Sequence, residues 1–175
     1  MHKRFMLVAA CVWCGACTHM SLRSPAATAT VAPTKGNQTA GTVNFVQRGS
    51  VVYVDAHING LSPGLHGFHI HEKGDCRADG GNAGGHFNPA GAAHAGPEGS
   101  PRHAGDLGNL NADANGVAVY RAQVSGISLG TGADSIVGRA VIVHANVDDL
   151  RSQPSGNSGG RIGCGLISKS ADQWF

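Results

Sequence analysis

Apolar and polar side chains alternate along several short segments of this chain. From residue 52 to residue 58 every second side chain is apolar, and the side chains between them are Tyr53, Asp55 and His57. A period of two places one set on each face of an extended strand. Segments of similar character run from Gly41 to Gln47, from Val117 to Val124 and from Arg139 to Val143. Because a helical period is absent almost everywhere after residue 28, we predict an all-β domain.

The turns and loops narrow the choice of fold. Glycine-rich turns separate the short segments, and the chain contains 27 glycines. Many short antiparallel strands are typical of a β-sandwich or a Greek-key β-barrel, and we predict about eight of them. Two irregular stretches interrupt the pattern, from Gly74 to Asn109 and from Ala145 to Gly163. Long loops in a compact domain are usually functional, so we expect both to carry functional side chains.

The N-terminal residues are typical of an export signal. Met1–Arg4 is basic, and Phe5–Ala16 is an apolar run too short to span a bilayer as a helix. The run ends in Cys14-Gly15-Ala16-Cys17, which is similar to a bacterial lipoprotein processing site. Cys17 is therefore the predicted lipidation site, and a cleaved signal without a lipid is the alternative. We expect a signal peptide (1–17), a flexible linker (18–27) and one domain (28–171) in the periplasm or cell envelope.

Charge and cysteine content fit an exported domain. The formal charge is +2, and without Lys3 and Arg4, which leave with the signal, the basic residues equal the 11 acidic ones. A near-neutral domain without a basic run lacks the electrostatic footprint of a nucleic-acid-binding protein. Once three cysteines are assigned to the leader, Cys76 and Cys164 remain. An even pair in an exported domain predicts a disulfide.

Ten histidines in 175 residues indicate metal binding rather than catalysis by a single base. His69 and His71 stand two apart in a strand pattern, so both rings lie on one face while Phe68 and Ile70 face the core. The same parity turns His144 outward, toward these two histidines. The first long loop supplies three nitrogens and a carboxylate that suit tetrahedral zinc, namely His86, His94, His103 and Asp106. Imidazole-rich sites with an open position suit copper.

Four segments extend this pattern to a known family. They are Gly64 to His71, Gly85 to Pro89, Arg102 to Asn109 and Gly156 to Gly165. In order and in spacing they resemble signature segments of the copper,zinc superoxide dismutases, in a version typical of exported bacterial proteins. The resemblance extends from about residue 40 to about residue 168.

The resemblance implies a role for each matching residue. His69, His71 and His144 would bind copper, His94, His103 and Asp106 would bind zinc, and His86 would bridge both metals. Asp148 matches the carboxylate that links a copper histidine to a zinc histidine. Arg161 matches the arginine beside the open copper position, and His66 matches a structural histidine. The remaining histidines, His2, His19 and His57, are expected to have no role at the metals.

The implied reaction is the disproportionation of superoxide to oxygen and hydrogen peroxide, with His86 as the nearby acid. One alternative is a non-catalytic periplasmic protein that binds copper and zinc on the same barrel. A zinc hydrolase is a weaker alternative, because its only candidate base, Glu72, faces away from the copper histidines. In the loop from Asp149 to Ser155 the only cation is Arg151, so the source of anion steering stays open. Strand patterns leave both a monomer and a homodimer possible.

Overall fold

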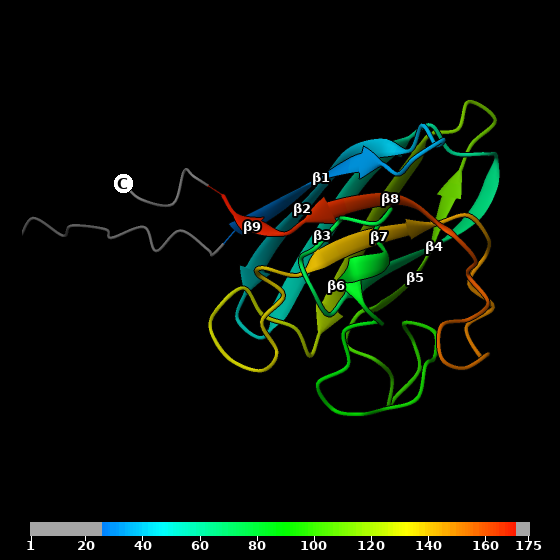
Figure 1. Cartoon of the computed structure of the whole chain (residues 1–175). Helices are drawn as coiled ribbons and strands as arrows, with labels where there is room; N and C mark the ends of the chain where they lie inside the picture. The colour runs from blue at the N-terminus through cyan, green and yellow to red at the C-terminus, as the bar shows by residue number, and fades with distance from the viewer. Residues whose placement is uncertain (1–25, 171–175) are drawn as a thin grey trace, which may run out of the picture.

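The computed structural model describes residues 26–170, which form one antiparallel β-barrel (Figure 1). The elements are β1 Ala26–Pro33, β2 Ala40–Arg48, β3 Val51–Asn59, β4 Gly64–His71, the short 3-10 helix η1 Gly81–Ala83, β5 Asp106–Ala112, β6 Ala118–Ser125, β7 Ala140–His144, β8 Arg161–Leu166 and β9 Ser168–Lys169. Within the described residues, no helix has the length and apolarity needed to cross a membrane. The prediction of an all-β domain of about eight strands is confirmed.

The strands form a nearly closed barrel. Their order in the sheet is β5-β4-β7-β8-β1-β2-β3-β6, with β9 paired to β1, and all neighbouring strands are antiparallel. The connections from β3 to β4 and from β6 to β7 join strands that are not neighbours, as a Greek-key arrangement requires. The two edge strands, β5 and β6, face each other, and the Tyr120 hydroxyl on β6 donates a hydrogen bond to the Leu107 carbonyl on β5 (2.9 Å).

Alternation along the strands separates the core from the site. The apolar set of β3 is at most 1% exposed, while the side chains between its members are exposed. On β4 and β7, the core-facing side chains are Phe68, Ile70, Val141 and Val143. The histidines that alternate with them on β4 therefore lie on the outer wall of the barrel, as predicted.

Two loops cover that part of the wall, and both are shorter than the sequence pattern indicated. The first loop is residues 72–105, because β5 already begins at Asp106. The second loop is residues 145–160, because β8 begins at Arg161. Asp106–Asn109 contains no β-branched residue, and it becomes a strand through pairing with β4 across a bulge between Gly67 and His69.

The N-terminal boundary also differs from the prediction. The strand β1 begins at Ala26, inside the range 18–27 that was expected to be a linker, and Ala27 is buried in the core. Pairing with β2 and β9 draws these alanines into the sheet, although alanine favours strands only weakly. The expected signal peptide, including Cys17, lies outside the described residues.

Candidate metal centre

A disulfide fixes the first loop to the barrel. Cys76 and Cys164 are joined, 88 residues apart in sequence, and this confirms the predicted pair. Cys76 lies near the start of the first loop and Cys164 lies on β8. In Figure 1 the first loop (green) and the second loop (orange) lie side by side over the same part of the barrel, and hydrogen bonds join them. The disulfide therefore anchors one of two loops that together enclose the histidines.

One cluster of potential metal ligands consists of four histidines. His69 and His71 come from β4, His144 is the last residue of β7, and His86 comes from the first loop, where it forms an isolated β-bridge with His71. Their ligand nitrogens lie within 4.8 Å of one another, and no residue of the four is more than 7% exposed. This is the set that the resemblance assigns to copper.

Backbone carbonyls hold two of these rings in orientation. His71 Nδ1–H donates to the carbonyl of Gly84 in the first loop (2.9 Å), and His144 Nδ1–H donates to the carbonyl of Gly159 in the second loop (3.1 Å). Each bond places the proton on Nδ1, so Nε2 of the same ring presents a lone pair. Each loop therefore fixes the tautomer of one histidine that belongs to the barrel wall.

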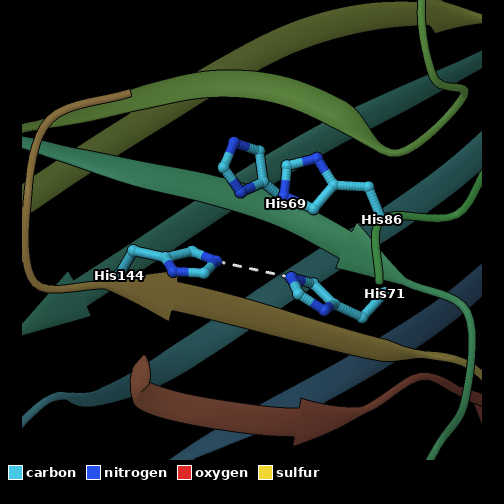
Figure 2. Close-up of side chains that lie close together, drawn as sticks. All are labelled: His69, His71, His86 and His144. Atoms are coloured by element: carbon cyan, nitrogen blue, oxygen red, sulfur yellow. Dashed lines mark hydrogen bonds between the residues drawn. The ribbon is translucent and has the colours of Figure 1, made fainter. Parts of the chain in front are cut away.

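The remaining nitrogens of the four rings converge on one point (Figure 2). His71 Nε2 and His144 Nε2 are only 3.3 Å apart, joined by the dashed line in the figure. His69 Nδ1 and His86 Nε2 are buried and have no hydrogen-bond partner among residues 26–170. Buried polar atoms normally have partners, and facing lone pairs repel unless a cation lies between them. The donor set therefore fits copper, for which imidazole is a good ligand.

A second cluster surrounds one carboxylate oxygen. Asp106 Oδ1 lies 2.7 Å from His86 Nδ1, 3.0 Å from His94 Nδ1 and 3.2 Å from His103 Nδ1. His94 Nδ1 makes no hydrogen bond within the described part of the chain. The other oxygen, Oδ2, accepts hydrogen bonds from the backbone amides of His103 (3.1 Å) and Ala95 (3.2 Å). Three imidazoles and one carboxylate fit tetrahedral zinc. This zinc set consists of His86, His94, His103 and Asp106.

His86 belongs to both clusters. Its Nδ1 faces the zinc set through Asp106, while its Nε2 faces the copper set without a hydrogen-bond partner in residues 26–170. The ring is 4.0 Å from the ring of His69 and 5.4 Å from the ring of His103, measured between centroids. One imidazole therefore separates the two sites and connects them.

A second connection between the clusters runs through Asp148 in the second loop. Its Oδ2 accepts a hydrogen bond from His69 Nε2–H (2.8 Å), and its Oδ1 accepts one from His94 Nε2–H (2.9 Å). Asn109 on β5 holds the backbone of this residue, since its amide donates to the Asp148 carbonyl (2.9 Å) and accepts from the Asp148 amide (2.8 Å). The carboxylate thus orients one histidine of each set.

Burial keeps three histidines of the copper set neutral. Desolvation lowers the pKa of His69 to about 4 and that of His144 to about 3, and it holds the pKa of His71 well below its usual range. Burial alone would raise the pKa of Asp106, but the hydrogen bond from His86 and other polar contacts outweigh it and lower this pKa to about 2. Neutral imidazoles and an ionised carboxylate are the forms that bind metal ions.

The copper set faces an opening. A cavity of about 220 Å³ is lined by His71, His86 and His144 and by Pro154, Ser155 and Arg161, among others. The guanidinium of Arg161 donates hydrogen bonds to the carbonyls of Gly80 and Gly84 in the first loop. Its positive charge is therefore held at the edge of the copper opening.

Other histidines and acids lie where the sequence pattern placed them. His66 is buried, with Nδ1 2.9 Å from the His144 carbonyl and Nε2 near Ser62, in agreement with a structural role. His57 is exposed on β3, and Glu72 is exposed and does not line the copper opening. His2 and His19 lie outside the described residues.

Sequence reasoning missed several groups that hold the ligands. The carbonyls of Gly84 and Gly159 carry no side-chain signature, so nothing in a single sequence marks them. Asn109 falls inside a recognised segment, but only its contact with Asp148 reveals a task for it. Gln153 contacts His94, which lies 59 residues away in the other loop, and no sequence motif predicts this contact.

Comparison with known proteins agrees with this geometry. A family model described as copper/zinc superoxide dismutase matches residues 39–167. The chain is 45% identical over 140 residues to the extracellular superoxide dismutase [Cu-Zn] of Haemonchus contortus, covering 74% of each chain. It is 46% identical over 141 residues to the superoxide dismutase [Cu-Zn] of Paramecium bursaria Chlorella virus 1, covering 77% of this chain and 75% of the relative.

Proposed function

The chain belongs to the copper/zinc superoxide dismutase family, and from this premise we propose how its own residues carry out the reaction and where the protein works. It is an oxidoreductase that converts two superoxide anions and two protons into oxygen and hydrogen peroxide. The observation that carries this conclusion is His86, whose two ring nitrogens face two complete ligand sets. Copper, when bound, supplies the redox chemistry by accepting an electron from one superoxide and giving an electron to a second.

His86 is the residue to which we assign proton delivery. Its Nε2 is buried and has no hydrogen-bond partner within residues 26–170, and the residue lines the copper opening. Its Nδ1 is fixed on the zinc side next to Asp106. A proton on Nε2 therefore faces the space that the second superoxide occupies, where peroxide needs it.

Arg161 is the residue to which we assign anion capture. Its guanidinium lines the same opening as three copper-set histidines, and hydrogen bonds to two carbonyls of the first loop hold it in place. A fixed cation beside an open metal position attracts a small anion and aligns it. Asp148 is assigned the orientation of His69 and His94, because its two oxygens accept hydrogen bonds from both rings.

We further assign the protein to the exported, bacterial type of this family, which protects the cell envelope from external superoxide. The basic and apolar N-terminal segments support a signal peptide within residues 1–17, and a relative carries the description extracellular. Cys17 is the proposed lipid anchor, residues 18–25 a tether, and the periplasm or cell envelope the compartment. Mass spectrometry of the mature N-terminus tests this, since an acylated Cys17 supports the anchor and a cleavage beyond Cys17 contradicts it. Either a monomer or a homodimer is compatible with this assignment.

Arg161→Ala tests the proposed mechanism. In the fully metallated protein we expect kcat/KM for superoxide to fall about 10-fold, because a fixed cation at the opening is lost. The control is Arg151→Ala, which removes an exposed cation of the second loop that does not line the opening. The copper absorption spectrum should change in neither variant.

Three results would contradict parts of this proposal. An unchanged rate in Arg161→Ala would remove Arg161 from anion capture. A large change in its copper spectrum would make it structural instead. A metallated wild-type protein that does not accelerate superoxide decay would favour the alternative, a copper- and zinc-binding protein without turnover.

A further inference from the structure

One side chain of the second loop makes hydrogen bonds to both the backbone amide and the carbonyl of a zinc-set histidine. Gln153 Oε1 accepts a hydrogen bond from the His94 backbone amide (2.8 Å), and Gln153 Nε2–H donates to the His94 carbonyl (2.9 Å). His94 is 3% exposed, so its main-chain groups depend on protein partners rather than on water. A single amide thus replaces the two hydrogen bonds that a neighbouring strand would otherwise provide.

The same loop also holds the ring of His94. Its Nε2–H donates to Asp148 Oδ1 (2.9 Å), and this bond leaves Nδ1 directed at the zinc set. The two contacts divide the task, because Asp148 fixes the tautomer and rotation of the ring while Gln153 fixes the position of the backbone that carries it. A ligand needs both, since a rotated or a displaced imidazole equally misses the ion.

Gln153 also stands next to the wall of the copper opening. Pro154 and Ser155, which follow it directly, line the cavity with His71 and His86. The amide of Gln153 therefore joins the chain that borders the copper side to the chain that carries a zinc ligand. Within residues 26–170, no other side chain of the second loop makes a hydrogen bond to the backbone of His94.

We propose that Gln153 is a positioning residue that locks His94 in place for zinc and couples occupation of the zinc site to the order of the copper opening. The proposal rests on the two-metal function proposed above. It predicts that loss of the amide weakens zinc retention by about 10-fold, as is usual for partners that orient metal ligands. It also predicts that, once this amide is lost, zinc binding orders the segment around Pro154 and Ser155 less than it does in the wild type.

Gln47 offers a matched control for the loss of a bridging amide. Gln47 Oε1 accepts a hydrogen bond from the Leu129 backbone amide (2.7 Å), and Gln47 Nε2–H donates to the Gly49 carbonyl (3.1 Å). This residue ties the end of β2 to the loop that follows β6, and it contributes to neither ligand set. Gln47→Ala and Gln153→Ala therefore remove the same kind of contact at two places.

The test compares both variants with the wild-type holoprotein. Zinc release to a chelator gives retention directly, and cobalt(II) placed in the zinc site reports ligand geometry through its visible spectrum. We expect faster zinc release and an altered cobalt spectrum in Gln153→Ala only, while Gln47→Ala resembles the wild type in both. Hydrogen exchange of residues 150–156, with and without zinc, measures the coupling, and we expect zinc to slow exchange less in Gln153→Ala.

The outcomes separate this inference from the function on which it rests. Equal zinc release and equal cobalt spectra in Gln153→Ala and the wild type would overturn the role of Gln153. Equal changes in both variants would also overturn it, since they would reflect general loss of stability. A wild-type protein that fails to bind cobalt and copper at two separate sites would instead overturn the proposed two-metal function.

Discussion

Replacing Asp148 with asparagine removes a charge and one acceptor from the connection between the two metal sites. The carboxylate is buried, at 2% exposure, and each of its oxygens accepts a hydrogen bond from one imidazole N–H, of His69 and of His94. An asparagine amide has only one oxygen. It can accept from one ring, and its own N–H group then faces the N–H of the other ring. Asp148→Asn therefore leaves two donors facing each other in a buried position.

The size of the effect follows from the two ways to relieve this conflict. A buried donor without an acceptor costs about 1–3 kcal/mol. Otherwise the ring changes tautomer, and its metal-facing Nδ1 takes the proton and loses its lone pair. In both cases metal affinity should fall by about 10–100-fold, the usual effect of losing a partner of a metal ligand. We expect zinc to be lost first, because His69 is fixed in β4 between two strands whereas His94 lies in a loop.

Metal content after dialysis against a chelator is the assay for Asp148→Asn. Asp55→Asn is its control, since Asp55 is an exposed carboxylate of β3 paired with Arg121 on the surface. We expect zinc-deficient protein from Asp148→Asn and normal metal content from Asp55→Asn. Retention of both metals by Asp148→Asn at wild-type affinity would refute the view that this carboxylate orients the ligands.

Two further predictions concern stability. Cys164→Ser should lower the free energy of unfolding by about 4.6 kcal/mol on the chain-entropy account, since the bridge spans 88 residues. The substitution should also speed metal loss, because the bridge anchors the first loop. Denaturant unfolding measures the stability, a zinc titration measures the affinity, and an unchanged zinc affinity would contradict this prediction. In the metal-free protein, the folded-state pKa of His69 (about 4) and of His144 (about 3) lies below the unfolded value near 6.5. The unfolded chain therefore binds more protons as the pH falls below 6.5, and stability should decline between pH 6.5 and 4 by up to about 3 kcal/mol per histidine. Urea unfolding of the metal-free protein that gives a flat profile over this range would refute the prediction.

The sequence alone determined the parts of this protein that depend on local pattern. Period-two alternation in residues 52–58 identified β3, and the same parity placed His69 and His71 on the outer face of β4. The identity and order of the ligands were visible as well, because histidines at these spacings recur as segments of one family. Local pattern failed at Asp106–Asn109, where strand formation depends on a partner rather than on propensity.

Only the tertiary structure decided how those ligands are held. It selected Nδ1 of His69 as a metal-facing atom, because His69 Nε2–H donates a hydrogen bond to Asp148, 79 residues away. It selected Nε2 of His71, because His71 Nδ1–H donates to the Gly84 carbonyl. It also brought Gln153 to the backbone of His94. A ring tautomer depends on the acceptor that the fold places beside it, and backbone carbonyls are alike at every position. Neither leaves a mark in the residue types, so this information exists only once distant segments have packed together.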